Sequence, residues 1–159
     1  MKNGLLILLL ATSLFAKEAV LPSELSAWKA LSYLGSAKNP QELPYATLTL
    51  NTASLVGLVP TPKIQYVARP TNEGGSVSYG GMFQLTLKES GLYRVVLANA
   101  SWIEMVKDAK GSQSVAHSHG PDYSGIRKMV DYALEAGTYT LQLSAGADTT
   151  SAILVTKLK

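Results

Sequence analysis

The chain has 159 residues, of which 47% are apolar and 16% are charged, and it contains no cysteine. This length suffices for one domain with its own core and is too short for two domains of ordinary size. The low charged fraction argues against long disorder and against a strongly basic nucleic-acid binder. The lack of cysteine excludes disulfides, thiolate metal sites and a cysteine nucleophile.

Residues 1–16 have the pattern of a signal peptide. Lys2 supplies a positive charge, an apolar run covers Gly4 to Ala11, and Ala16 is a small residue suited to cleavage. The run is too short for a permanent membrane span. We therefore expect a periplasmic or secreted protein that is cleaved near Ala16. Thirteen basic and eleven acidic residues then remain, and this small excess does not favour nucleic acid as a partner.

The segment 17–44 is predicted to be a short helix followed by a linker. Ser23 is a candidate N-cap, Gly35 is a candidate stop, and Pro40 and Pro44 are typical of a loop. The apolar residues between them recur at helical spacing: Leu25, Trp28, Leu31 and Leu34.

From residue 45 the hydrophobic period changes to two, which indicates a β domain over residues 45–159. Short strands at roughly ten-residue spacing, separated by turn signals, predict an all-β fold, namely an antiparallel β-sandwich. A jelly-roll-like arrangement and a small closed barrel are the alternatives, because they share the same alternation. The expected strands are 45–50, 63–68, 76–87 with an interruption at Gly80-Gly81, 92–98, 101–107, 112–117, 127–134, 138–144 and 151–158.

Two segments resemble each other internally. Residues 89–97 and 135–143 each begin with Glu-x-Gly and continue into a strand. We expect the tyrosine of each strand to bury its ring and to direct its hydroxyl to the backbone at a corner of the sandwich. The expected inward residues are Tyr93, Val95 and Leu97 in the first segment and Tyr139, Leu141 and Leu143 in the second.

The only two histidines, His117 and His119, stand two residues apart. On a strand this spacing directs both imidazoles to one face, and Asp122 follows after the Gly120-Pro121 turn. Two imidazoles and a carboxylate form a donor set for copper, zinc or iron. The alternative is a polar loop whose histidines bond to backbone. Arg127 and Lys128 follow, and as neighbours on a strand at most one of them would join a given site.

A resemblance to known proteins rests on four segments: Ser-Tyr-Gly-Gly at 78–81, Gly-Leu-Tyr-Arg-Val at 91–95, Ala-His-Ser-His-Gly-Pro at 116–121 and Gly-Ile-Arg-Lys-Met-Val-Asp at 125–131. They resemble a group of small exported bacterial proteins, some of which carry the label homogentisate 1,2-dioxygenase. Gly111, five residues and His117-Ser-His119 also resemble the opening of the first cupin motif. Tyr123 and Ser124 stand where that motif has its Glu, and the later cupin histidine is missing.

Two functions follow from these patterns. The chain contains no complete catalytic set, no nucleophile elbow and no phosphate-binding loop. We therefore expect a non-enzymatic binding or interaction module, with a small ligand or a protein as partner and with metal binding through the His-x-His loop. The alternative, implied by the resemblance, is a metal-dependent cupin-like dioxygenase.

Overall fold

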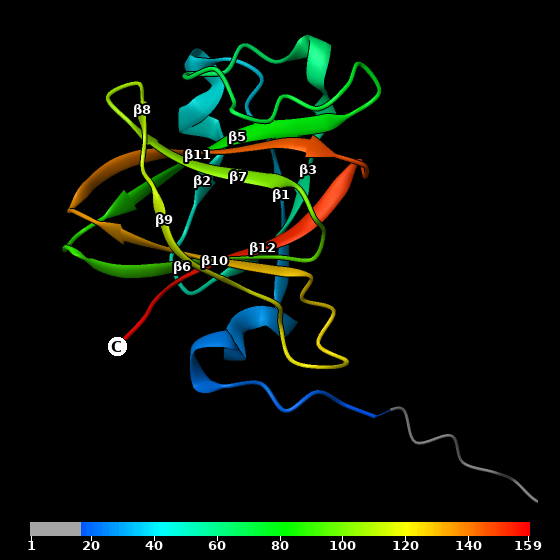
Figure 1. The fold of residues 1–159 in the computed structure, drawn as a ribbon, viewed down its shortest axis with the longest axis vertical. Helices are drawn as coiled ribbons and strands as arrows, with labels where there is room; N and C mark the ends of the chain where they lie inside the picture. The colour runs from blue at the N-terminus through cyan, green and yellow to red at the C-terminus, as the bar shows by residue number, and fades with distance from the viewer. Residues whose placement is uncertain (1–16) are drawn as a thin grey trace, which may run out of the picture.

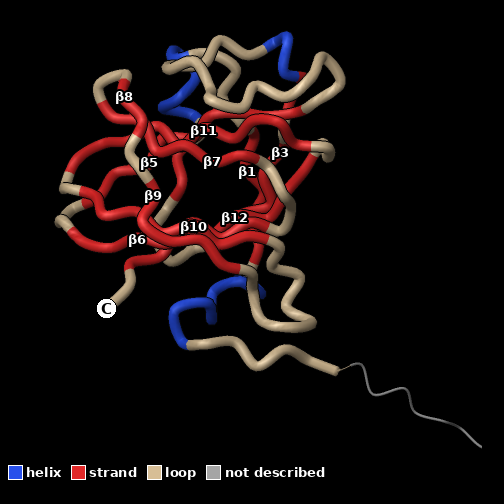
Figure 2. The backbone as a smooth tube through the Cα atoms, viewed as in Figure 1, coloured by secondary structure: helices blue, strands red, loops and turns tan. Residues whose placement is uncertain are grey.

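The computed structural model describes residues 17–159, so the predicted signal peptide lies outside the described residues. Two sheets pack face to face, with helical turns at the top and bottom of the stack (Figures 1 and 2). The strands do not form one sheet closed on itself, and the predicted sandwich is confirmed. Within residues 17–159, no helix combines the length and the apolar character needed to cross a membrane.

The first sheet has six strands, and its order places β6 and β12 at the centre. Its strands, from edge to edge, are β1 (Leu31–Gly35), β3 (Ala53–Gly57), β12 (Thr150–Lys157), β6 (Gly91–Leu97), β10 (Lys128–Leu134) and β9 (Ser114–Ser118). All its pairs are antiparallel except β1 with β3, which is parallel.

The second sheet lies above the first in Figure 1 and is centred on β5 and β11. Its strands, in order, are β2 (Thr47–Leu48), β5 (Tyr79–Leu87), β11 (Gly137–Gly146), β7 (Trp102–Lys107) and β8 (Lys110–Gly111), with β4 (Val59–Pro60) also pairing with β5. Here β2 runs parallel to β5 and the other pairs are antiparallel.

The two related segments form central strands of opposite sheets. Their predicted inward residues are all buried, and the rings of Tyr93 and Tyr139 lie in the main core. The Tyr93 hydroxyl donates to the carbonyl of Glu89 at 2.7 Å, and that of Tyr139 donates to the carbonyl of Glu135 at 3.1 Å. Each bond closes the turn where the chain crosses from one sheet to the other, from β5 to β6 and from β10 to β11. The predicted tyrosine corners are confirmed.

The N-terminal segment differs from its prediction. The helix η1 (Ser23–Lys29) is a short 3-10 helix without a side-chain cap, and Leu31 and Leu34 belong to β1 instead. Residues 31–35 pair with β3, a partner more than twenty residues away, so tertiary pairing prevails over helical spacing. The sandwich therefore includes residues that precede position 45.

Leu25 and Trp28 of η1 pack on the outer face of the first sheet, as their spacing predicts. They form a second, smaller apolar cluster with strand and loop residues: Ala53, Val96, Ile126, Met129, Ala152 and Leu154. Full burial of Leu25 contributes roughly 2 kcal/mol to this contact.

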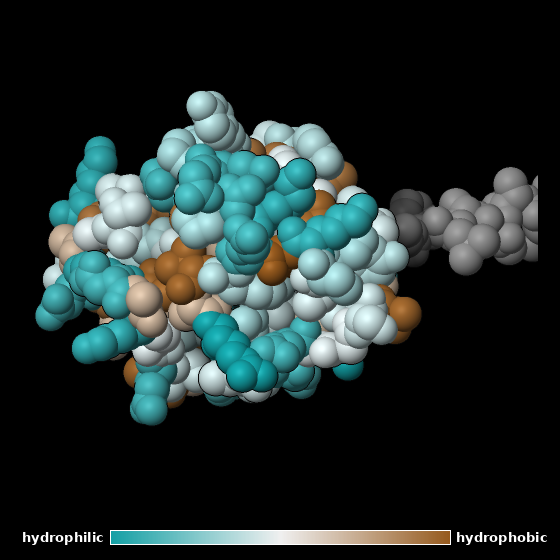
Figure 3. Space-filling model, turned by 90° about the horizontal axis from the view of Figure 1, so that it is seen from above, coloured by the Kyte–Doolittle hydropathy of each residue, from teal (hydrophilic) through white to brown (hydrophobic). Residues whose placement is uncertain are grey.

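The predicted strand at 63–68 is wrong, and the predicted strand at 45–50 is reduced to the two residues of β2. The helices η2 (Pro40–Tyr45) and η3 (Thr61–Lys63) and the irregular residues 64–78 instead lie over the second sheet (Figure 1). Seen from above in Figure 3, this cover is mainly hydrophilic and surrounds a smaller hydrophobic area. Alternation over 63–68 reflects burial of one face, which a segment lying across a sheet achieves as well as a strand.

The cover is held by side chains rather than by strand pairing. The amide of Gln142, which is 1% exposed, accepts from Ala68 N at 3.1 Å and donates to Ala68 O at 3.0 Å. The Tyr66 hydroxyl donates to the Leu143 carbonyl at 2.8 Å. A side chain at Gly80 would collide with both the Tyr66 hydroxyl and the Leu143 carbonyl, which explains the glycine in this otherwise regular strand.

The tyrosine corners are testable by removing single hydroxyl groups. Tyr93→Phe and Tyr139→Phe should each lower the free energy of unfolding by about 1 kcal/mol, because each leaves a corner carbonyl without its donor. Urea unfolding of the variants measures this loss. Tyr33→Phe is the control, since that side chain is mostly exposed and its hydroxyl forms no corner. Corner variants as stable as the control variant would show that the hydroxyls do not stabilise the crossings.

Candidate functional site

The His-x-His segment lies at the end of an edge strand. His117 belongs to β9, and His119 follows just after β9 ends at Ser118. Both imidazoles line a pocket of about 250 Å³, whose other walls are Ala100, Ser118, Arg127 and Lys128. The predicted proximity of the two histidines is thus observed, in a pocket without a lining carboxylate.

The two imidazoles have different hydrogen-bond partners. His119 Nδ1 lies 3.0 Å from the carbonyl oxygen of Arg127, and because a carbonyl only accepts, Nδ1 carries the proton and Nε2 stays available. His117 Nε2 lies 2.9 Å from the hydroxyl oxygen of Ser114, three residues earlier along β9. The backbone and hydroxyl partners match the alternative of a polar loop as well as they match a ligand site.

Asp122 does not join this pocket. It is exposed in the turn that follows Pro121, and it does not line the pocket of the two histidines. Among residues 17–159, no three His, Cys, Asp or Glu side chains are grouped so that they could hold a metal ion. A metal here would therefore depend on the two imidazoles alone, with two basic residues beside them.

Arg127 and Lys128 both line the pocket, which differs from the expectation that only one would do so. The reason is that β10 begins at Lys128, so Arg127 is not a strand residue and the strand alternation does not apply. The Lys128 ammonium donates to Ala100 O at 3.3 Å and to Ser101 O at 2.8 Å. Burial lowers the pKa of Lys128, and its third N–H remains for another acceptor.

A second pocket, of about 550 Å³, adjoins the first. It is lined by Thr71, Trp102, Ile103, Glu104, Gly111, Ser112, Gln113, Ser114 and Tyr132. Two contacts join the pockets, the bond between Ser114 and His117 and the position of Lys128 Nζ 5.5 Å from the centre of the Trp102 ring. We call the two pockets together the edge groove. Its lining residues come from β7, β8, β9 and β10 and from the loops next to them, and β9 crosses the side of the sandwich in Figure 1.

Trp102 and Glu104 are held in place by the cover over the second sheet. The Trp102 indole donates to the Thr71 hydroxyl oxygen at 2.9 Å. Glu104 Oε1 accepts from Thr71 N at 2.9 Å and from its hydroxyl at 2.7 Å. Glu104 Oε2 has only a long contact of 3.4 Å from Gln142 Nε2, so it keeps acceptor capacity. Sequence reasoning missed both residues as a site, because residue 71 lies thirty residues away along the chain.

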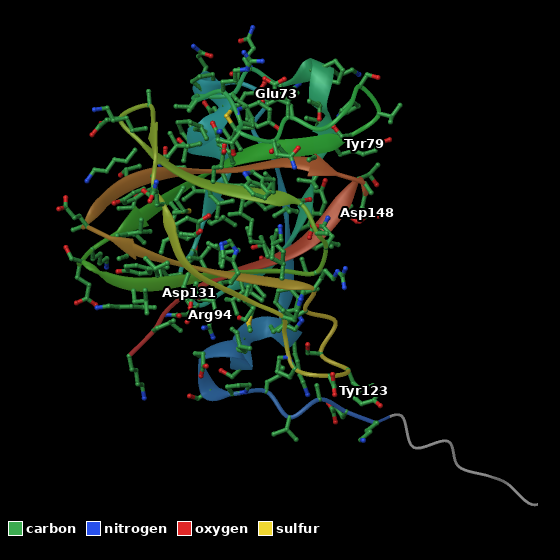
Figure 4. The ribbon with its side chains drawn as sticks, in the orientation of Figure 1. Glu73, Tyr79, Arg94, Tyr123, Asp131 and Asp148 are labelled. Carbon is green, nitrogen blue, oxygen red and sulfur yellow. The ribbon has the colours of Figure 1, made fainter. Side chains whose placement is uncertain are left out.

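The loop that carries His119 is fixed from its other side. The Trp28 indole donates to the Ser124 carbonyl at 3.0 Å, and Ile126 is buried beside η1. Tyr123, labelled in Figure 4, lies near the N-terminal segment, where Lys17 Nζ is 5.2 Å from the centre of its ring. The helix η1 therefore holds the loop, and with it one wall of the edge groove.

The ion pair between Arg94 and Asp131 is structural. Arg94 donates to both carboxylate oxygens of Asp131, at 2.7 and 2.8 Å, on the outer face of the first sheet (Figure 4). The bond to Asp131 raises the pKa of Arg94, and Glu24 of η1 approaches to 3.9 Å. Glu104 lies on the outer face of the opposite sheet. The two carboxylates therefore do not face one cleft, as a glycosidase pair would.

The comparisons with known proteins give no family assignment. No model of a known protein family matches the chain, and no curated protein matches it either. The resemblance to exported proteins and the cupin-like dioxygenase alternative therefore stay predictions.

Tyr132, which lines the larger pocket of the groove, makes the stability of the folded protein depend on pH. Burial first, and the charge of Glu104 second, raise the pKa of Tyr132 above its ordinary value of about 10. The folded protein then keeps this proton at a pH where the unfolded chain has lost it. The contribution of Tyr132 to the free energy of unfolding is fully present below about pH 10. Above that pH the free energy of unfolding falls by roughly 1.4 kcal/mol per pH unit for one such group.

Tyr66 and Tyr93 change stability in the same direction, because burial raises the pKa of each. Tyr132→Phe should make the alkaline fall in stability shallower by roughly 1 kcal/mol per pH unit, measured by urea unfolding at a series of pH values above about 9. The slope is diagnostic even though the variant also loses the bond to the Ile103 carbonyl. An unchanged slope would mean that this phenol titrates alike in the folded and unfolded chains.

Proposed function

We propose that this protein is an exported, non-enzymatic binding module and that it binds its ligand in the edge groove. The observation that carries the proposal is the lining of the smaller pocket: two imidazoles, Arg127 and Lys128, with no carboxylate. Such a pocket favours an anionic group over a divalent cation, because Lys128 and Arg127 repel a cation and attract an anion.

Lys128 is the residue that makes this pocket suited to an anion. Its ammonium is partly removed from water, and two of its three donors are already used by the carbonyls of residues 100 and 101. Its position is therefore fixed before a ligand arrives, which reduces the entropy lost on binding. Arg127, which lines the same pocket, extends the positive wall.

The arrangement of potential catalytic groups supports binding rather than catalysis. Ser114 and His117 are in contact, as a nucleophile and a base would be, but no acidic side chain lines the pocket of His117. Asp131 is fully engaged by Arg94. Within residues 17–159, no three His, Cys, Asp or Glu side chains are grouped as the metal site of an oxygenase would require.

Sulfate and phosphate are the probes for this proposal, titrated into residues 17–159 by calorimetry at low ionic strength. We expect one weak, salt-sensitive site, and Lys128→Gln should weaken it about tenfold, because a hydrogen bond to a charged group contributes about 1.5–3 kcal/mol. Lys63→Gln is the matched control, since it removes the same charge from η3 on the cover.

Copper(II) and zinc(II) form the competing arm of the same experiment. A single metal site that is lost in the His117→Ala, His119→Ala double variant, together with no binding of either anion, would contradict the proposal and support the predicted metal site. Sulfate or phosphate binding that is equally strong in Lys128→Gln would contradict the proposal as well, because the anion would then bind at another place on the protein.

A further inference from the structure

The edge groove extends well beyond the positive pocket, and its larger part has a different character. Trp102 is 39% exposed there. Its indole N–H is held by Thr71 and its ring is held near the Lys128 ammonium, so the exposed ring surface is fixed in orientation. A fixed, exposed aromatic ring offers a flat surface on which a ligand ring can stack.

The residues around Trp102 are polar and both donate and accept hydrogen bonds. Glu104 offers the carboxylate oxygen that has only a long hydrogen-bond contact. Gln113 is exposed, and its side-chain amide can both donate and accept. Ser112 and Ser114 add hydroxyl groups to the lining. A ligand that fits this lining has a flat apolar face and many hydroxyl groups along its rim, which describes a sugar ring.

We propose that the ligand of the edge groove is an acidic oligosaccharide, with a sugar ring stacked on Trp102 and a carboxylate bound at Lys128 and Arg127. This inference rests on the proposed function and adds the class of ligand. A chain of several sugar rings fits two adjoining pockets better than one small anion does. A nucleic acid fits less well, because Glu104 beside Trp102 offers acceptor oxygens, to which the hydroxyls of a sugar ring can donate and the phosphates that flank a stacked base cannot.

The probes are tetragalacturonate and tetramannuronate, which carry a carboxylate on every ring and differ in the arrangement of their hydroxyls. The controls are the fully methyl-esterified tetragalacturonate, which keeps the rings without the charge, and monomeric galacturonate, which keeps the charge without the length. We expect at least one tetramer to bind about tenfold or more tightly than both controls, a gain that corresponds to about 1.4 kcal/mol.

Tryptophan fluorescence reports the place of binding. The chain has two tryptophans, and Trp28 is only 7% exposed, so a change of emission on adding the tetramer should come from Trp102. Trp102→Ala should abolish this change and weaken the binding of the tetramer about tenfold. Trp102→Phe should restore part of the affinity, and near-ultraviolet circular dichroism checks that both variants fold.

The outcomes separate this inference from the proposed function. If sulfate binds through Lys128 but neither tetramer binds better than monomeric galacturonate, the oligosaccharide is wrong and the binding module stands. If neither sulfate nor either tetramer binds, both fail. Tighter binding of a short single-stranded oligonucleotide than of either tetramer, lost in Trp102→Ala, would replace the sugar with a nucleic acid and overturn the inference.

Discussion

The two sheets of the sandwich approach each other along one side without joining, and the candidate site depends on this open side. Among residues 17–159, no strand pairing connects β8 or β9 to the opposite sheet. The chain leaves β7 through a tight hairpin turn in which Asp108 and Ala109 both have positive φ, as in type I′ turns. It then crosses to the first sheet and forms β9, and the edge groove lies along this crossing.

The walls of the groove are positioned by the two outer layers of the molecule. On the second sheet, the amide of Gln142 holds the irregular cover, and the cover in turn supplies Thr71 to Trp102 and Glu104. On the first sheet, η1 fixes the loop after β9 through the bond from Trp28 to Ser124. Two segments that are not strands therefore determine the shape of a site between strands. The bonds of Gln142 and Trp28 that anchor these segments are partly buried, and the bonds of Thr71 are exposed.

The sequence predicts the fold well where its pattern is local. The expected strands from residue 76 onward correspond to β5 to β7 and β9 to β12, while the two-residue β8 is not among them. The repeated Glu-x-Gly with its tyrosine predicts both corners, because each corner bond spans only four residues. The strands β1 and β3 are missing from the prediction, since β1 forms only through pairing with a distant segment. In the irregular cover the prediction fails in the other direction, because residues 63–68 alternate as a strand would and yet form none.

The candidate site could be predicted only in part for a related reason. The histidine pair and its two basic neighbours lie within twelve residues, so sequence reasoning brings them together. Trp102, Glu104 and Thr71 come from two other segments, and only the packing of the cover against β7 places them in the same groove. The turn from Gly120 to Gly125 directs Asp122 to solvent, an outcome that depends on how η1 holds the loop.

The most direct test of the account is a map of the ligand's position on the folded protein. Backbone amide shifts of residues 17–159, followed by nuclear magnetic resonance during titration with sulfate and then with tetragalacturonate, provide this map. The account predicts that sulfate shifts the amides of 100–101, 117–119 and 127–128, and that the tetramer also shifts those of 102–104 and 111–114. Shifts confined to another part of the surface, such as the hollow formed by residues 47–51 with Lys88 and Lys157, would contradict it.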